Sequence, residues 1–189
     1  MKYETGNGKT DTEKAAQGDC SDIVEGVGEY DVAKRTANVP YPYAPSDGLA
    51  YINKSLKNWG KTSYAFAIEL KSEKKLIGIM GLEAVNVFAG TATTGSWINK
   101  KYWRQGYITE AKVAINDFAF DTLKLRRLNS TVNTDNVASN AAQKKMGYVH
   151  EGVMRKAARS LATHKLHDLN LYGLLKEDWK KVRKGLIAK

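Results

Sequence analysis

The sequence predicts an α/β fold with a mixed sheet flanked by helices, and three observations lead to this prediction. Two stretches with helical spacing of apolar residues come first in the chain. Three strand-like stretches follow them, which together predict an antiparallel meander. The second half then alternates between helix and strand patterns, which is typical of a mixed sheet. A chain of 189 residues, 42% of them hydrophobic, is sufficient for one domain with one core.

The N-terminal segment, residues 1–22, has the weakest pattern. It combines glycines with many polar residues and contains no apolar run. This composition is compatible with a frayed arm or with an irregular first strand, and the sequence leaves both open. We therefore expect a single domain over residues 23–189, preceded by an irregular or frayed segment.

Two amphipathic helices are expected next. The first follows the helical spacing of apolar residues that begins at Ile23 and continues to Val32, and an extended, proline-containing loop follows over residues 39–43. The second is expected to start at Ser46 and to stop at Gly60. Its apolar residues recur at spacings of three and four: Leu49, Ile52, Leu56 and Trp59.

A meander of three strands is predicted in the middle of the chain. Apolar residues alternate over residues 64–70, a polar turn follows over residues 72–75, and residues 76–82 are again apolar. This arrangement predicts a hairpin, and a third strand over residues 92–99 extends it.

The second half of the chain predicts further helices and strands in alternation. A helix that begins near Ile108 has an apolar stripe, and its opposite face carries Lys112, Asn116 and Asp121. The remaining elements are expected in this order: a strand over residues 125–132, a short helix over 139–146, and strands over 148–156 and 165–174.

The net charge of +10 is concentrated in the second half of the chain. Residues 1–94 carry 11 Lys and Arg against 12 Asp and Glu, whereas residues 95–189 carry 19 against 8. The basic half is compatible with a nucleic acid, with a phosphate-bearing cofactor, or with a merely soluble basic surface. Charge alone therefore does not select a function.

Several classes of protein are disfavoured. The sequence contains neither an apolar run of eighteen residues nor a secretory signal, so we expect a cytoplasmic protein without a membrane span. The single cysteine, Cys20, cannot form an internal disulfide, and the three histidines lack the spacing of a zinc site. No metal is predicted, and Cys20 is expected to have no catalytic role.

A basic turn at residues 100–106 leads directly into the helix that begins near Ile108. Helix starts present unpaired backbone N–H groups, and a glycine such as Gly106 lets the main chain approach a bound group, so this turn favours phosphate. Arg104 and the neighbouring lysines add positive charge. One glycine in such a turn is weak evidence by itself, and an ordinary loop is the alternative.

The sequence around this turn resembles the acetyl-CoA-binding segment of GNAT acetyltransferases. The resemblance rests on Gly-Ser-Trp-Ile at residues 95–98 and Trp-Arg-Gln-Gly-Tyr-Ile-Thr-Glu-Ala at residues 103–111. Asn136 and Ser139, followed by Lys-Lys-Met-Gly-Tyr at residues 144–148, are similar to a second motif of the family. The resemblance covers about residues 30–180 and is closest to the ribosomal-protein N-acetyltransferase branch, the RimJ/RimL type.

The resemblance implies a GNAT-type acyl-CoA N-acyltransferase fold, with a central mixed sheet of six or seven strands. It implies transfer of an acetyl group from acetyl-CoA to a primary amine, either a protein N-terminus, for example of a ribosomal protein, or a small molecule. No membrane or specific DNA partner is expected, and the protein would be a monomer or a homodimer. The residues expected to bind acetyl-CoA are Trp97, Ile98, Arg104, Gln105, Gly106, Tyr107, Ile108, Thr109, Asn136 and Lys145.

The implied reaction needs a group that protonates the leaving thiolate and a base that accepts the proton of the amine. Ser139 is expected to protonate the thiolate, and a cap of its helix is the alternative role. Glu83, at the end of the second strand of the meander, is the candidate base through a water, with a solvated carboxylate as the alternative. Tyr41 and Tyr43 are expected to line the acceptor pocket.

The chain departs from the family pattern at three positions. Trp103 replaces a Gln or Arg of the cofactor turn, Ile108 replaces a Gly or Ala, and Thr93 stands where an acidic residue is common. A catalytically degenerate GNAT domain that binds coenzyme A as a sensor is therefore one alternative function. A basic module that binds RNA or the ribosome is the other.

Overall fold

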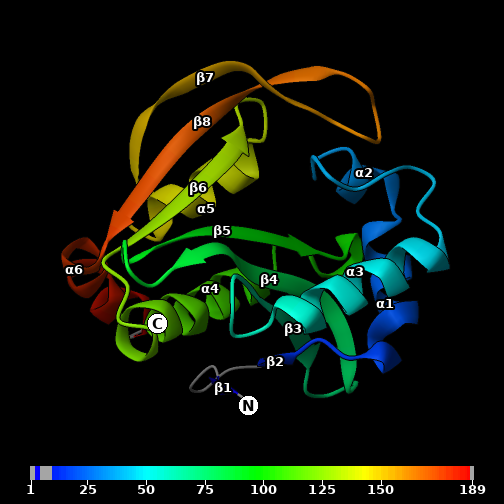
Figure 1. Cartoon of the computed structure of the whole chain (residues 1–189), viewed down its shortest axis with the longest axis horizontal. Helices are drawn as coiled ribbons and strands as arrows, with labels where there is room; N and C mark the ends of the chain where they lie inside the picture. The colour runs from blue at the N-terminus through cyan, green and yellow to red at the C-terminus, as the bar shows by residue number, and fades with distance from the viewer. Residues whose placement is uncertain (1–2, 5–9, 188–189) are drawn as a thin grey trace.

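The computed structural model describes residues 3–4 and 10–187, which form one twisted sheet with helices on both faces (Figure 1). The strands are β1 (Tyr3–Glu4), β2 (Thr10–Lys14), β3 (Tyr64–Leu70), β4 (Lys75–Asn86), β5 (Thr91–Ile98), β6 (Arg127–Asn133), β7 (Val149–Arg159) and β8 (Leu166–Leu175). Their order in the sheet is β1-β2-β3-β4-β5-β6-β8-β7. Only the β5–β6 pair is parallel among these described strands, so the predicted mixed sheet is confirmed.

The longer helices are α1 (Cys20–Val27), α3 (Pro45–Asn58), α4 (Tyr107–Asp117), α5 (Val137–Lys145) and α6 (Lys176–Ile187). Shorter helical segments are η1 (Gln17–Asp19), α2 (Tyr30–Ala33), η2 (Lys100–Tyr102) and the π-helical η3 (Phe118–Thr122). The first predicted helix is thus two helices, because the chain turns at Gly28 after α1. No helix in the described ranges is long and apolar enough to cross a membrane.

The two faces of the sheet are covered by different helices, as the alternation of strand side chains requires. Phe66 and Ile68 of β3 pack with α4 and α6 on one face. Ala65 and Ala67, the intervening residues, pack with α1 and α3 on the other. All four side chains are at most 7% exposed, so β3 is buried on both faces.

Of the two alternatives for residues 1–22, a first strand is found at residues 10–14, which form the regular strand β2, while residues 17–22 belong to η1 and the start of α1. Thr10 and Thr12 are fully buried, and β2 pairs antiparallel with β3. The Thr10 N–H and hydroxyl both donate to a Glu110 carboxylate oxygen of α4, at 2.9 and 2.8 Å. Strand β2 has no alternation of apolar residues, and the buried polar groups of Thr10 are instead satisfied by hydrogen bonds to an acidic side chain that is distant in the sequence. Residues 1–2 and 5–9 of the expected segment lie outside the described residues.

The C-terminal helix α6 was not predicted, although its sequence contains a helical signal. Trp179, Val182 and Leu186 recur at spacings of three and four and pack on the core that α4 covers. Asp117 fixes the helix, because it accepts hydrogen bonds from Trp179 Nε1 at 2.9 Å and from Arg183 Nε at 2.6 Å. Helix α6 thus closes the end of the sheet next to α4.

The face of α4 that carries Lys112 and Asn116 is buried, although these polar residues lie opposite the apolar stripe of the helix. Lys112 is 4% exposed and Asn116 is fully buried, whereas Asp121, in η3, is exposed. Neither side-chain polar atom of Asn116 has a hydrogen-bond partner among the described residues. Helix α4 therefore brings a positively charged side chain into the interior of the protein.

Candidate functional site

The site begins where the parallel strands β5 and β6 separate. Their pairing covers only Thr91–Thr93 of β5 against Arg127–Asn129 of β6, although both strands continue. Strand β6 stays paired with β8 up to Asn133, and β5 stays paired with β4 up to Ile98. The edge of β5 that faces β6 is therefore open over residues 94–98.

The main chain of Ile98 faces this opening. The N–H of Asn99 donates to the Ile77 carbonyl of β4 at 2.8 Å, and successive residues of a strand turn their peptide groups to opposite sides. The Ile98 carbonyl accordingly points away from β4, where it accepts a hydrogen bond from Trp103 Nε1 at 2.8 Å. The N–H of Ile98 lies on the same side of the strand and is directed toward the opening.

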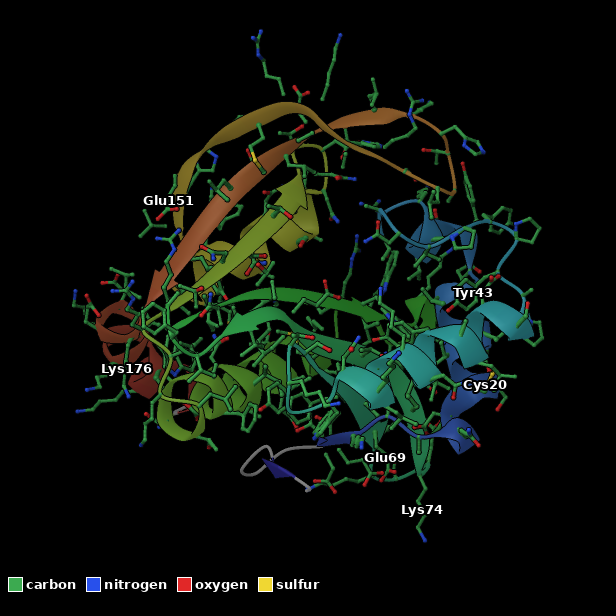
Figure 2. All side chains as sticks on the ribbon, in the orientation of Figure 1. Cys20, Tyr43, Glu69, Lys74, Glu151 and Lys176 are labelled. Atoms are coloured by element: carbon green, nitrogen blue, oxygen red, sulfur yellow. The ribbon has the colours of Figure 1, made fainter. Side chains whose placement is uncertain are left out.

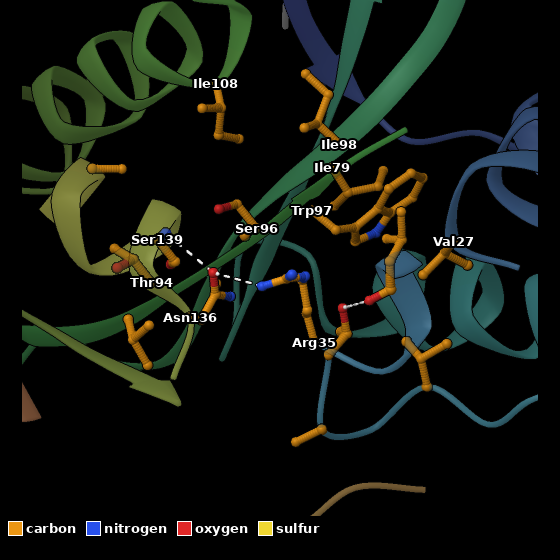
Figure 3. A pocket seen from close by; sticks show the side chains of 18 of the residues that line it. Val27, Arg35, Ile79, Thr94, Ser96, Trp97, Ile98, Ile108, Asn136 and Ser139 are labelled. Atoms are coloured by element: carbon orange, nitrogen blue, oxygen red, sulfur yellow. Dashed lines mark hydrogen bonds between the residues drawn. The ribbon is translucent and has the colours of Figure 1, made fainter. Parts of the chain in front are cut away.

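A pocket of about 970 Å³ fills the space beyond the splayed strands (Figure 3). Its walls come from β5 and β6, from the starts of α4 and α5, and from α1, α3 and the loop after α2. On the β5 wall, Trp97 packs against α1 so closely that a Cβ on Gly26 would lie 2.7 Å from its ring. The wall of the pocket therefore includes residues from helices on both faces of the sheet.

The start of α4 presents main-chain donors to this pocket. Gly106 is the N-cap residue and has a φ of 88°, and no atom lies within 4 Å of the position that a Cβ would occupy there. The N–H groups of Thr109 and Glu110 both donate to the Gly106 carbonyl. Those of Tyr107 and Ile108 precede them and lack an intrahelical acceptor. This geometry suits an anion, as the sequence predicts for the turn.

The two bulky departures from the family pattern have structural roles. Trp103 donates to the Ile98 carbonyl, and the guanidinium of Arg35 lies 5.9 Å from its ring centroid. Ile108 is half-buried and packs against the core on the α4 side, while it also lines the pocket. Both side chains therefore help to build the wall of the pocket.

The start of α5 forms the opposite wall. Asn136 is the N-cap residue, and its Oδ1 accepts hydrogen bonds from the Ser139 N–H at 3.2 Å and from Arg35 at 3.4 Å. Figure 3 shows both bonds beside the opening. The cap of α5 is thus Asn136, and the alternative role of Ser139 as the helix cap is wrong. The Ser139 side chain is half-buried and lines the pocket.

The part of the pocket between β4 and α3 contains a carboxylate and two tyrosines. Glu83 is exposed on β4 opposite Thr93 and lines the pocket with Tyr43 and Tyr51. Burial raises the pKa of Tyr51 to about 12, and the nearby Glu83 carboxylate acts in the same direction. Burial likewise raises the pKa of Tyr43 to about 12. Both phenols are therefore neutral donors at physiological pH.

Four residues expected at the site do not line this pocket. Tyr41 is 48% exposed and packs edge-on against Tyr30, with 5.0 Å between ring centroids. Gln105 is exposed and donates to the Lys101 carbonyl at 3.0 Å. Thr109, in the first turn of α4, and Lys145, in the last turn of α5, are not among the residues that line the pocket. Their expected binding roles remain predictions.

The structure adds residues that the sequence analysis missed. Arg35, Tyr51 and Gln143 line the pocket, and Lys112 lines it from a buried position. No local pattern marks these residues, because their positions depend on how α2, α3, α4 and α5 pack. Cys20, by contrast, is the first residue of α1 and lies at the edge of the molecule (Figure 2), where its Sγ donates to the Pro45 carbonyl of α3 at 3.7 Å.

Comparison with known proteins identifies the family. The acetyltransferase (GNAT) domain matches residues 14–149, which is more than half of the chain. This chain belongs to the GNAT acetyltransferase family. The resemblance predicted from the cofactor turn is therefore confirmed, and the match also reaches back into β2, before the expected domain start.

Relatives of this GNAT protein include enzymes named for ribosomal proteins. It is 34% identical over 116 residues to the uncharacterized N-acetyltransferase YoaA of Bacillus subtilis, and the match spans 61% of this chain and 64% of the relative. It is 28% identical over 109 residues to the ribosomal-protein-serine acetyltransferase of Escherichia coli, and this match spans 58% of this chain and 60% of the relative. The chain thus covers less than two thirds of either relative.

Solved structures confirm the fold. Mycobacterium smegmatis RimJ in complex with CoA-disulfide aligns with a TM-score of 0.82 at 15% identity, over 95% of this chain and 88% of that one. The ribosomal-protein-S5-alanine acetyltransferase of Vibrio fischeri also aligns with a TM-score of 0.82, at 17% identity. That alignment covers 95% of this chain and 98% of the other. The predicted GNAT-type mixed sheet with flanking helices is therefore confirmed. The described strands number eight, however, and not the expected six or seven, because the two-residue strand β1 pairs with β2 at the edge of the sheet.

Proposed function

We propose that this protein is an N-acetyltransferase that moves an acetyl group from acetyl-CoA to a primary amine. The observation that carries this proposal is the open edge of β5 at Ile98, which faces a large pocket between two helix starts. The neighbour RimJ of M. smegmatis has the same fold and is a complex with a coenzyme A derivative.

Acetyl-CoA would bind across both helix starts. In the turn from Arg104 to Thr109, the N–H groups of Tyr107 and Ile108 and the dipole of α4 would hold the pyrophosphate. Trp97, Ile98 and Asn136 would contact the pantetheine arm along the splayed edge, and Lys145 would add positive charge at the rim.

The reaction would be a direct attack of the amine on the thioester. The amine nitrogen forms a bond to the carbonyl carbon, the C–S bond breaks, and the thiolate leaves. The N–H of Ile98 would stabilise the oxygen of the tetrahedral intermediate, as oxyanion donors do. The Ser139 hydroxyl would give its proton to the thiolate, and the amine proton would pass to a base.

The acceptor amine determines how strong that base must be. A lysine-like amine costs about 4–5 kcal/mol to neutralise at pH 7, whereas an α-amine costs only about 1 kcal/mol. A base acting through water, Glu83, is therefore sufficient for an α-amine. Two relatives, the putative ribosomal N-acetyltransferase YdaF of Bacillus subtilis and the ribosomal-protein-serine acetyltransferase of Escherichia coli, are named for the ribosome, which supports a protein N-terminus as the acceptor.

Glu83→Gln tests this base. We expect the pH–rate profile of the variant to lose its acidic limb, because the amide cannot accept the proton. Glu69→Gln is the matched control, since Glu69 lies on β3 away from the pocket (Figure 2). A profile for Glu83→Gln that equals that of the unaltered protein would remove Glu83 from the mechanism.

The whole proposal is tested by binding and turnover together. Acetyl-CoA is titrated by calorimetry, and thiol release is followed with peptides of different N-terminal residues, with polyamines and with small amines. We expect micromolar binding and the fastest release with an α-amine peptide. Tight binding with no turnover on any amine would indicate a coenzyme sensor. Salt-dependent RNA retention without coenzyme binding would indicate a ribosome- or RNA-binding module.

A further inference from the structure

A buried lysine forms part of the pocket wall. Lys112 lies on α4, is 4% exposed and lines the pocket. Its Nζ donates to Gln143 Oε1 at 3.2 Å, and Gln143 Nε2 donates to Ser130 Oγ at 2.6 Å. Gln143 comes from α5 and Ser130 from β6, beyond the point where β6 leaves β5. Three elements therefore hold the ammonium group at a fixed place in the wall.

The charge of Lys112 is incompletely compensated. Within the described ranges it meets no carboxylate, and the titratable group that faces it is Tyr148, whose ring centroid lies 5.9 Å from Nζ. Burial raises the pKa of Tyr148, so this phenol stays neutral. An ammonium group has three N–H donors, and Gln143 accepts one of them. Burial alone lowers the pKa of Lys112 to about 8.

A structural role does not explain this arrangement. A buried charge without a counter-charge destabilises the folded state, and an apolar side chain of the same length would fill the space at less cost. Perturbed lysines of this kind cluster at functional sites, where a ligand completes their hydrogen bonds. The unused donors of Lys112 therefore point to an oxygen acceptor in the pocket.

We propose that Lys112 is a coenzyme-binding residue whose ammonium group donates to an oxygen of the pantetheine arm of acetyl-CoA. Gln143 is the positioning residue that orients it. Lys112 lies six residues beyond Gly106, about 9 Å along the helix at 1.5 Å per residue, so it serves a deeper part of the ligand than the pyrophosphate. The inference rests on the proposed function, because it requires coenzyme A in this pocket.

Lys112→Met is the direct test. We expect the Kd for coenzyme A to rise about tenfold or more, since a hydrogen bond from a charged donor is lost. The affinity for the nucleotide half of coenzyme A, without its pantetheine arm, should stay the same. The melting temperature should stay equal or rise, because a buried charge is removed. Lys144→Met, at an exposed position of α5, is the control with the same change in charge.

The pH dependence gives a second readout. Binding of an oxygen acceptor favours protonated Lys112, so the affinity of the unaltered protein for coenzyme A should fall as pH rises through about 8. The affinity should fall more in the unaltered protein than in Lys112→Met. In that variant, titration of the coenzyme itself is the remaining cause of a pH-dependent affinity.

Equal coenzyme affinities for Lys112→Met and Lys144→Met, with matching pH curves, would overturn this inference and leave the proposed function standing. No coenzyme binding by the unaltered protein would overturn both. A loss of affinity for the nucleotide half as well would contradict the assignment to the pantetheine arm. If Lys112→Met did not fold, Lys112→Gln would give the same comparison with a polar side chain.

Discussion

Ser139→Ala is expected to lower kcat roughly ten- to thousandfold with little change in coenzyme affinity. The proposed proton donor is removed, so the thiolate leaves unprotonated. The structure predicts that α5 survives this change, because Asn136 caps the helix through the Ser139 main-chain N–H, which alanine retains. Steady-state kinetics and calorimetry with acetyl-CoA measure the two quantities separately.

Asn136→Ala is the control for Ser139→Ala, because it is expected to change coenzyme affinity, which Ser139→Ala leaves nearly unchanged. It removes the α5 cap, which costs about 1 kcal/mol of stability, and it removes a proposed contact to the pantetheine arm. We expect coenzyme affinity to fall in this variant, whereas it is retained in Ser139→Ala. Unchanged turnover in Ser139→Ala would show that the hydroxyl has no part in the reaction.

Gly78→Ala is expected to lower the free energy of unfolding by roughly 3 kcal/mol. A Cβ on Gly78 would lie 2.5 Å from the Trp97 carbonyl oxygen and 3.0 Å from Ile98 Cα. Both are main-chain atoms of β5, so the strand itself must shift to relieve the clash. Because that strand carries the open edge of the site, coenzyme affinity should fall as well. Denaturant unfolding and calorimetry measure the two effects.

Gly81→Ala separates this clash from the general effect of adding a methyl group to β4. A Cβ on Gly81 would lie 3.7 Å from the nearest atoms, the carbonyl oxygens of Gly95 and Tyr64, which is an ordinary contact. We expect its free energy of unfolding to stay within about 1 kcal/mol of the unaltered protein. Equal losses in both variants would contradict the close approach of β4 and β5 at Gly78.

Local patterns determined most of the elements from the sequence alone. Strand β3 appears with its predicted bounds, because alternation of apolar residues is a property of neighbouring positions. Strand β4 includes the predicted residues 76–82 but continues to Asn86, beyond the apolar run. The turn at Gly106 was also predictable, since a glycine and a helix start define a phosphate-binding geometry within a few residues. The family resemblance added the order of the motifs.

Packing between distant elements decided what the sequence left open. Strand β2 has no apolar pattern and is held by β3 and by Glu110, a hundred residues away. Lys112 is polar in any local pattern, yet the packing of α4 buries it in the pocket wall. Burial of a side chain depends on all the neighbours that surround it, so a single charged residue in a sequence does not reveal whether it faces water or a ligand.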